Sequence, residues 1–479
     1  TGTDNTWIGS NAGVGASGNS NSFNTGVGSD ALLSITTGGF NVAVGSRCAD
    51  ALTTGHQNVF VGDFAGSTTT DVGFATVVGH GAMGSGAVTN AADYTVAIGA
   101  IALENLTSGA DCLAVGGGAL AANTTGNHNL AIGRNSLNNL NHANSVRNIA
   151  IGAYSGDGMG TLDGNFDNVF IGYGSGGGTW TGAASKGNVA VGTSTMDANM
   201  DTAYYNTALG NSALSGLTSG DENTAIGGDA GKQLTSSDDN TFVGYQSGFY
   251  TTGASNTYAG HSAGKGASGA ESSNVGVGKD ALLAVTTGSY NAVLGQGAAK
   301  AMTDGHNNVA IGNQALMTST SAGICVVIGD DAMKNGDVTS AADGTVAIGG
   351  SALYALTSGA RNTAVGYNAG LGMSTSSDCT LVGYMAGEDM DSLGSTPQSC
   401  TYIGGYAGRF LDDGTLNTAV GHGAMEGTTG GSSCSENAAF GHHSLTAITT
   451  GDYNTAIGAD SLKVITTQSN NTAVGFKAA

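Results

Sequence analysis

The sequence has little proline, few aromatic residues, few basic residues and no long apolar run. It holds one proline, Pro397, and 84 glycines without a strict third-position pattern, which excludes collagen and is not typical of a disordered linker. Thirteen Lys or Arg residues against 35 Asp or Glu give a net charge of −22, which argues against nucleic acid and against an anionic membrane surface as partners. No segment approaches the roughly 18 apolar residues that a membrane span needs, so we expect no membrane insertion.

What the sequence does contain is a short repeat along the whole chain. Its core reads Asn-Thr-Ala-Val/Ile-Gly, as in Asn362–Gly366 and Asn454–Gly458, and we call the last residue the anchor glycine. Anchor glycines occur 27 times, and 15 of the 26 intervals between them are 17 residues long, the others 16 to 21. Such short, glycine-dense units disfavour helices and suit strands and tight turns. The sequence therefore predicts an all-β fold, a parallel β-solenoid of about 27 coils with a 17-residue basic repeat, each coil having two short strands and two turns.

The position four residues before the anchor carries Asn in 20 of the 27 copies and Cys in four of the others. In stacked coils these side chains would form a ladder from coil to coil, about 4.8 Å apart. The ladder residues on which we base this prediction are Asn41, Asn58, Asn129, Asn223, Asn291, Asn308, Asn362, Asn454, Asn471, Cys379 and Cys400. Six cysteines are too few for a disulfide scaffold, and we favour packed thiols over a disulfide for the consecutive pair Cys379 and Cys400.

A second, longer period indicates an internal duplication. The anchors of residues 28–133 and of residues 278–383 share the same series of intervals, offset by 250 residues. We see no linker between the copies. We therefore expect one β-solenoid rod over residues 1–479, duplicated approximately as 1–251 and 252–479.

Both faces of the predicted strand are apolar. The residues one and three before the anchor, mostly Val, Ile or Thr, suit a coil interior, while the residue two before it is mostly Ala or aromatic. We expect this second face to be a lateral interface of a homotrimer, because a long exposed apolar stripe is costly; the alternative is a monomer whose second face is merely small. The interface residues singled out are Ala150, Ala364, Phe60, Phe170, Phe242 and Tyr402.

The repeat Asn-Thr-Ala-Val/Ile-Gly-x-x-Ala resembles the YadA-like head repeats of trimeric autotransporter adhesins, and similar repeats occur in tail-fibre-like proteins of phages. The resemblance covers essentially the whole chain. It implies a left-handed parallel β-roll, trimeric and used in surface attachment. The period here is longer than that of the usual head repeat, and no coiled-coil stalk or membrane anchor is present in this sequence, so the resemblance supports the fold more than an adhesive role.

Candidate metal ligands are scattered. Asp157, Asp163 and Asp167 crowd one long spacer, and Asp412 and Asp413 another, and these carboxylates are the weak candidates for a calcium site. No other cofactor is indicated. His422 and His442 follow anchor glycines of successive coils, with His443 beside them, but without a further ligand set we expect solvated side chains rather than a metal site.

We expect the protein to be an extracellular structural or adhesive fibre at a cell surface or on a virion appendage, with itself and a surface glycan as partners. Two alternative functions stay open. The first is a self-assembling filament: the chain begins and ends within a coil, so either the natural chain is longer or subunits join end to end. Acidic pairs such as Asp238-Asp239 leave a polysaccharide-binding or polysaccharide-cleaving tailspike as the third possibility. Because these pairs lie on scattered turns, we expect no enzymatic activity.

Overall fold

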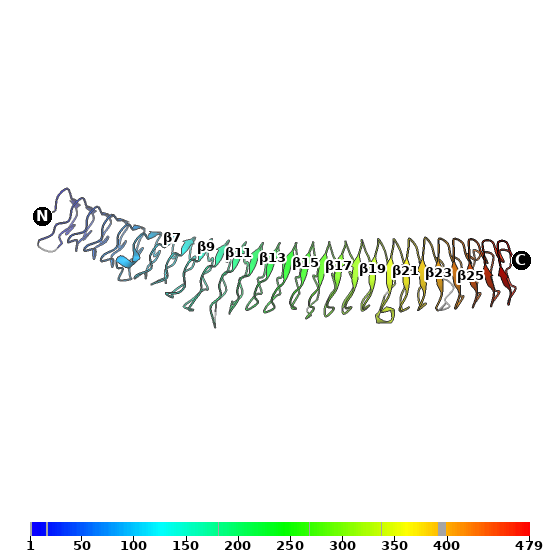
Figure 1. Cartoon of the computed structure of the whole chain (residues 1–479). Coiled ribbons are helices and arrows are strands. Elements are labelled where there is room, and N and C mark those ends of the chain that lie inside the picture. Colours follow the sequence, from blue (N-terminus) through cyan, green and yellow to red (C-terminus); the bar gives the residue numbers. More distant parts are fainter. Residues whose placement is uncertain (1, 16–17, 181, 268, 337, 391–398) are drawn as a thin grey trace. The chain divides into compact units, whose positions relative to one another are not determined.

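The computed structural model describes residues 2–15, 18–180, 182–267, 269–336, 338–390 and 399–479. The chain divides into two compact units, unit 1 (Thr1–Asn240) and unit 2 (Thr241–Ala479). Each unit is a stack of coils, and each coil contributes one parallel three-residue strand that ends immediately before an anchor glycine (Figure 1). The β-solenoid with a 17-residue spacing that the sequence predicts is thus confirmed for each unit.

Unit 1 contains thirteen strands and one short 3-10 helix among its described residues. They are β1 (Thr6–Ile8), β2 (Thr25–Val27), β3 (Val42–Val44), β4 (Val59–Val61), β5 (Thr76–Val78), η1 (Asn90–Ala92), β6 (Val96–Ile98), β7 (Leu113–Val115), β8 (Leu130–Ile132), β9 (Ile149–Ile151), β10 (Val169–Ile171), β11 (Val189–Val191), β12 (Thr207–Leu209) and β13 (Thr224–Ile226).

Unit 2 contains fourteen strands and one 3-10 helix within its described part. They are β14 (Thr241–Val243), β15 (Thr257–Ala259), β16 (Val275–Val277), β17 (Ala292–Leu294), β18 (Val309–Ile311), β19 (Val326–Ile328), η2 (Ser340–Ala342), β20 (Val346–Ile348), β21 (Thr363–Val365), β22 (Thr380–Val382), β23 (Thr401–Ile403), β24 (Thr418–Val420), β25 (Ala438–Phe440), β26 (Thr455–Ile457) and β27 (Thr472–Val474).

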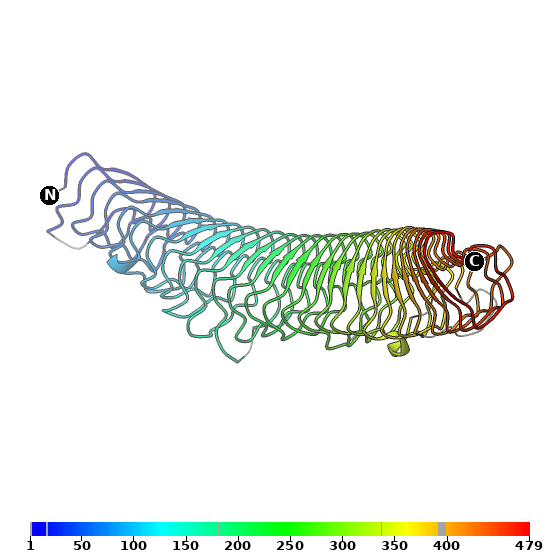
Figure 2. The ribbon, with the colours of Figure 1, turned by 45° about the vertical axis from the view of Figure 1, so that its right-hand side comes forward.

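The expectation of two strands per coil is wrong for the described residues. Outside the strand the chain runs mostly as turns, with two isolated bridges among the described residues, Lys186 with Tyr204 and Thr251 with Gly269. Neighbouring coils still bond there, as when the Thr36 N–H and hydroxyl both donate to the Thr53 carbonyl, at 2.9 and 3.0 Å. Left-handed backbone angles recur in each coil, and they interrupt the extended conformation that a second strand needs. The repeated path of the coils is visible in Figure 2.

The anchor glycine is required by its backbone conformation and by the close approach of the next coil. Gly45 has a φ of +145°, a region that side chains avoid, and a Cβ added to it would lie 2.2 Å from the Gly62 carbonyl oxygen of the next coil. The Gly45 N–H donates to the Val27 carbonyl of the preceding coil at 2.8 Å, and the Val44 carbonyl accepts from the Gly62 N–H of the next coil at 2.8 Å. Glycine at this position therefore sets the coil-to-coil spacing.

The asparagine column forms the predicted ladder in both units. The Asn41 side-chain amide donates to Asn24 Oδ1 at 3.1 Å and to the Gly55 carbonyl at 2.9 Å, and the Asn41 backbone N–H donates to the same Asn24 oxygen at 3.0 Å. Each amide therefore joins its own coil to the coils before and after it. The named asparagines that make bonds of this column are Asn41, Asn58, Asn129, Asn223, Asn291, Asn308, Asn362, Asn454 and Asn471.

Cysteine continues the column where asparagine is replaced. The Cys379 N–H donates to Asn362 Oδ1 at 2.9 Å, and the Cys400 thiol donates to the Gly414 carbonyl at 3.3 Å. Both cysteines are buried free thiols, and the hydrogen bond to Cys400, together with burial, raises the pKa of Cys379. Small, buried thiols thus occupy the space of the amides while keeping part of their backbone contacts.

The predicted lateral interface is wrong, because the residue two before the anchor points into the coil. Ala150, Ala364, Phe60, Phe170, Phe242 and Tyr402 all have an exposed fraction of 0% in the single chain. The residues one and three before the anchor lie on the outside instead, as the exposed, buried, exposed pattern of Val42–Val44 shows. Alternation gives two faces but does not say which is inside when both are apolar.

The coil interior is filled by complementary pairs of side chains. All six copies with an aromatic residue two before the anchor have Gly four after it, as in Phe60 with Gly66 and Tyr402 with Gly408. A Cβ on Gly66 would lie 2.4 Å from Phe60 Cε1, and one on Gly408 would lie 2.4 Å from Tyr402 Cδ2. Where the residue two before the anchor is small, the residue four after it is often large, as in Ala310 with Leu316. This sequence signal, which our prediction missed, would have identified the interior face.

Candidate functional site

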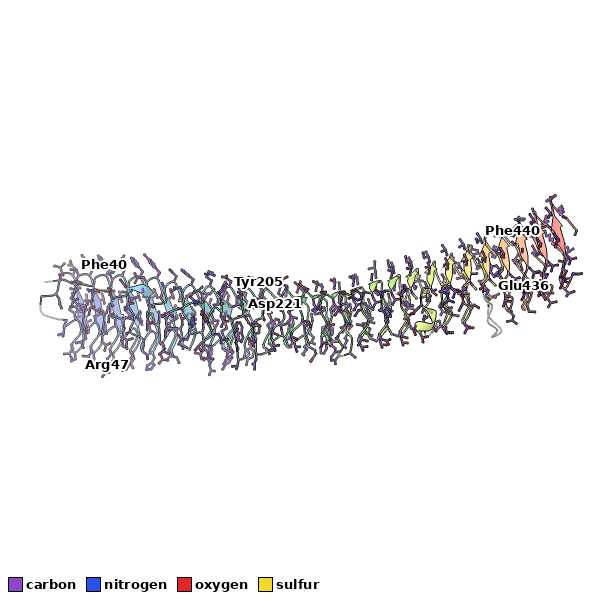
Figure 3. All side chains as sticks on the ribbon, turned by 60° about the horizontal axis from the view of Figure 1, so that its bottom comes forward. Phe40, Arg47, Tyr205, Asp221, Glu436 and Phe440 are labelled. Carbon is purple, nitrogen blue, oxygen red and sulfur yellow. The ribbon has the colours of Figure 1, made fainter. Side chains whose placement is uncertain are left out.

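Exposed aromatic side chains gather on the first coils of unit 1. The aromatic patch consists of Phe23, Phe40, Phe74 and Tyr94, each located immediately before the ladder position of its coil. The Phe23 and Phe40 rings stack with centroids 4.8 Å apart, and the Phe74 and Tyr94 rings stack at the same distance. Phe40 and Tyr94 are 60% and 61% exposed, so these rings stabilise little of the core. In Figure 3 Phe40 and Arg47 lie along opposite edges of unit 1.

The backbone at the patch is also unfavourable for bulky residues. Phe23, Phe40, Phe74 and Tyr94 have φ values of +61°, +61°, +56° and +60°. Left-handed backbone costs a residue with a Cβ roughly 1–2 kcal/mol, and Gly occupies the same repeat position at Gly344 without that cost. Four aromatic rings therefore stand where neither burial nor backbone preference favours them. The same left-handed φ recurs at this repeat position in other coils, as at Asp111 and His128, so it belongs to the coil, and the exposed rings are what distinguish the patch.

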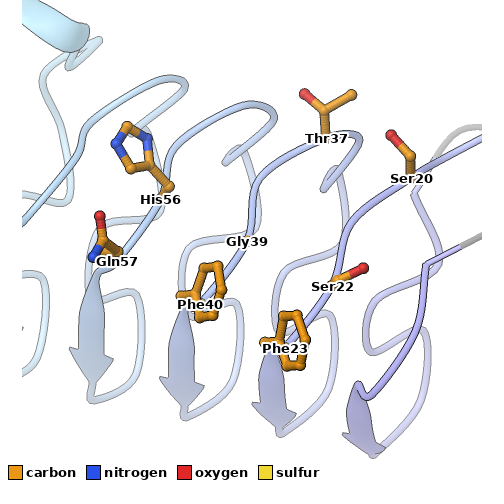
Figure 4. A pocket seen from close by; sticks show the side chains of 8 residues that line it. All are labelled: Ser20, Ser22, Phe23, Thr37, Gly39, Phe40, His56 and Gln57. Carbon is orange, nitrogen blue, oxygen red and sulfur yellow. The ribbon is translucent and has the colours of Figure 1, made fainter.

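A shallow pocket of about 400 Å³ lies along the first two rings of the patch. It is lined by Ser20, Ser22, Phe23, Thr37, Gly39, Phe40, His56 and Gln57 (Figure 4). Phe23 and Phe40 come from adjacent coils, just before β2 and β3, and hydroxyl, amide and imidazole groups surround them. No carboxylate lines this pocket among the described residues. Its chemistry can hold an uncharged ligand through apolar contact and hydrogen bonds, but offers no acid–base pair.

The calcium candidates of the long spacer do not converge. Arg147 Nε lies 2.6 Å from Asp167 Oδ1, and this ion pair lowers the pKa of Asp167. Asp163 accepts a hydrogen bond from the Asn144 amide at 2.7 Å. Asp157 lines a different pocket, and burial raises the pKa of its carboxyl group. The three carboxylates therefore have separate environments, and the spacer does not form one cation site.

The second pair of calcium candidates is equally incomplete. Asp412 is buried and Asp413 lies beside it in one turn of unit 2. Among the residues that the structure describes, the only group of three or more His, Cys, Asp or Glu side chains close enough to share an ion is a histidine cluster, His422, His442 and His443. The calcium candidates are not part of this group.

Unit 2 contains one fully buried carboxyl group that the sequence analysis did not single out. Glu271 lies between β15 and β16 with an exposed fraction of 0%, and burial raises its pKa to about 8. The buried Tyr258 ring is nearby, and burial followed by the charge of Glu271 raises the pKa of Tyr258. Glu271 therefore holds its proton at neutral pH. It stands seven residues before the anchor, a position that glycine occupies most often in the other copies, so a carboxyl group there is an exception within the repeat.

The rest of the chain adds no membrane or family assignment. No helix in the described ranges is both long and apolar enough to cross a bilayer. Compared with models of known protein families and with curated proteins, the sequence matches neither a family nor an individual protein.

Proposed function

We propose that the protein is an extracellular structural and adhesive fibre in which copies of the chain associate side by side, as a homotrimer. The proposal is supported by the repeat itself, whose hydrogen-bonded ladder stiffens each unit along the stack. A solenoid of this kind offers long, regular surfaces and few enclosed sites, which suits a scaffold better than a catalyst.

The single observation that carries the association is the outer face of the strands. Its residues, one and three before each anchor, are Val, Ile, Leu, Thr, Ala or Phe in every coil, with no charged residue, although the chain carries a net charge of −22. Val44, Leu209, Leu294 and Phe440 are 38%, 47%, 50% and 41% exposed. Within each unit this face is an uncharged stripe that is costly to leave in water. Its natural cover is the same stripe of other copies, because three copies arranged about a threefold axis bring their stripes together along that axis and close the assembly.

The test is the mass in solution by light scattering. We expect the unmodified chain to have about three times the chain mass of 46.6 kDa. Val44→Glu with Ile98→Glu should dissociate it, because the buried charges would be unpaired. Ser46→Glu with Ala100→Glu adds the same charge two residues later in the same coils, and this control should keep the oligomer. A 46.6 kDa unmodified chain would refute the proposal, and long filaments would favour end-to-end joining instead.

The adhesive part of the proposal rests on the aromatic patch. Exposed rings beside hydroxyl and amide groups are suited to the apolar faces and hydroxyls of a sugar, and the acidic chain favours a neutral sugar over an anionic one. We therefore propose that the patch binds a neutral surface glycan without cleaving it.

Affinity electrophoresis in gels containing neutral polysaccharides tests this proposal. Phe40→Gly should abolish the retardation of the chain, since it removes a ring from the pocket at a position where Gly is well tolerated. Tyr290→Gly is the matched control, because Tyr290 occupies the equivalent position of unit 2 and is 65% exposed. Equal retardation of all three proteins would overturn the proposal, and release of reducing sugar would show cleavage.

A further inference from the structure

Three histidines from two successive coils of unit 2 meet on the outside of the solenoid. His422 and His442 each follow an anchor glycine, and their rings stack with centroids 5.5 Å apart and 17° between their planes. The His443 ring lies 4.0 Å from the His442 ring and 5.7 Å from the His422 ring, nearly perpendicular to both. One ring nitrogen of each histidine lies within 4.8 Å of the other two.

The coil geometry holds this arrangement in place. The His443 N–H donates to the His422 carbonyl at 3.0 Å, which fixes the offset between the two coils at the cluster. Gly423 occupies in the earlier coil the position that His443 has in the later one. A Cβ on Gly423 would lie 2.6 Å from His443 Nδ1, so the missing side chain leaves the space that the imidazole fills.

His443 has one ring nitrogen without a hydrogen-bond partner in the part of the chain that the structure describes. This nitrogen, Nδ1, is shielded from water. Burial first, and then the neighbouring His442, lower the pKa of His443, and so does Lys463, which is paired with Asp460 at 2.7 Å. Glu426 acts in the opposite direction on the pKa of His443. A ring nitrogen that makes no hydrogen bond to the protein can bind a metal ion.

We propose that His422, His442 and His443 form a binding site for a divalent transition-metal ion, with Zn²⁺, Ni²⁺ and Cu²⁺ as the ions that three imidazoles favour. Bonds of about 2.0–2.1 Å in a tetrahedral site require the three nitrogens to approach to roughly 3.3 Å. His422 and His442 are exposed, so their rings can turn to close this distance. Three protein ligands leave one coordination position open to water or to another donor. Glu426 is a neighbouring carboxylate, since its Oε2 would lie 3.4 Å from the same Cβ on Gly423.

A matched control is present in the same unit. His261 also follows an anchor glycine, but Tyr245 precedes it in the stack at 5.4 Å and Lys279 holds the equivalent position of the next coil. It thus offers a single exposed imidazole at the same repeat position without a second histidine. The sequence already indicates the stacked pair with His443 beside it, and the folded coils turn the third ring toward the other two.

The experiment is calorimetric titration of the full chain with ZnCl₂, supported by the visible spectrum of the Co²⁺ form. We expect one ion per chain and Co²⁺ bands of a four-coordinate site. His442→Asn should weaken binding at least tenfold and lose those bands, whereas His261→Asn should behave as the unmodified chain. Zn²⁺ should also raise the melting temperature of the unmodified chain but not of His442→Asn.

Two results would overturn the proposal: no binding at micromolar Zn²⁺, or equal binding by all three proteins, which would indicate scattered surface sites. If His442→Asn melts at a lower temperature without metal, His422→Asn replaces it in the same comparison. This inference is independent of the lateral association and of the glycan patch.

Discussion

The two units share their interior construction at positions 250 residues apart. The Asn41 N–H donates to Asn24 Oδ1 at 3.0 Å, and the Asn291 N–H donates to Asn274 Oδ1 at the same distance. The short helices η1 and η2 also correspond. Beside them the Gly73 N–H donates to Asp93 Oδ1 and the Gly323 N–H to Asp343 Oδ1, each at 2.7 Å.

Their outer surfaces differ at the same spacing. The aromatic patch of unit 1 corresponds in unit 2 to Ser273, Tyr290, Ile324 and Gly344. The ladder and the packed interior thus recur while the outward column changes from stacked rings to unrelated side chains. The comparison shows that the coil is a scaffold and that recognition has to be sought in its outer columns. Four predictions test this comparison, beginning with the largest effect.

The two members of an interior pair should tolerate substitution only when both are changed together. Phe60 with Gly66 in unit 1 corresponds to Ala310 with Leu316 in unit 2. Phe60→Ala alone should cost about 3–5 kcal/mol because it leaves a cavity, and Gly66→Leu alone about 1–3 kcal/mol because it overfills the coil. The double variant carries the Ala and Leu pair of unit 2, and its free energy of unfolding should fall less than that of either single variant. Chemical denaturation measures the cycle, and additive costs would show that the two positions do not share one space.

A buried carboxyl group should make unit 2 sensitive to pH. Glu271 corresponds to Asn21 of unit 1, whose side-chain oxygen accepts a hydrogen bond from Asn5 at 3.0 Å. Since burial raises the pKa of Glu271 from 4.5 to about 8, the folded state keeps a proton that the unfolded state loses between these pH values. The free energy of unfolding should therefore fall as pH rises from about 4.5 to 8, by on the order of 4 kcal/mol.

The control for this prediction is Glu271→Gln. Removing the ionisable group should flatten the dependence of the melting temperature on pH over this window and stabilise the chain at pH 8. If the two proteins lose stability in parallel as pH rises, Glu271 is not the cause.

The ladder should be equally important in both units. Asn41→Leu and Asn291→Leu should each leave buried donors and acceptors unpaired, at about 1–3 kcal/mol for each group. Asn307→Leu is the control, because Asn307 is exposed one residue before the ladder and Leu416 occupies the same repeat position elsewhere. Thermal unfolding measures all three. An unchanged melting temperature for Asn291→Leu would contradict the ladder's contribution to stability.

The smallest effect is expected at the surface column. Tyr94→Gly reproduces Gly344 of unit 2, and lost stacking on Phe74 is offset by relief of the left-handed backbone, so stability should change by less than about 1 kcal/mol. Tyr94→Ala should be less stable than Tyr94→Gly, since Ala loses the ring and keeps a Cβ at a φ of +60°. The reverse order in a denaturant series would show that backbone strain is not significant here.

Much of the fold was predictable from the sequence because the repeat is a pattern of residues at fixed spacings along one chain. The spacing of the anchor glycines predicts the number of coils, and the asparagine column predicts the ladder, since identical side chains stacked at the strand spacing must meet. The candidate sites were less predictable. The exposed patch depends on which repeat position points outward, and the histidine cluster depends on Gly423 making room for a ring from the next coil.

By itself the sequence determined the period, the parallel stacking and the ladder, because each follows from spacing along one chain. Only the tertiary structure decided which strand face is inside. Both faces are apolar and alternation is symmetric, so the decision lies in packing: an aromatic ring such as Phe60 and the missing side chain of Gly66 fill one space inside the coil. That choice turns Val and Ile outward, and with them the face that we propose joins the copies.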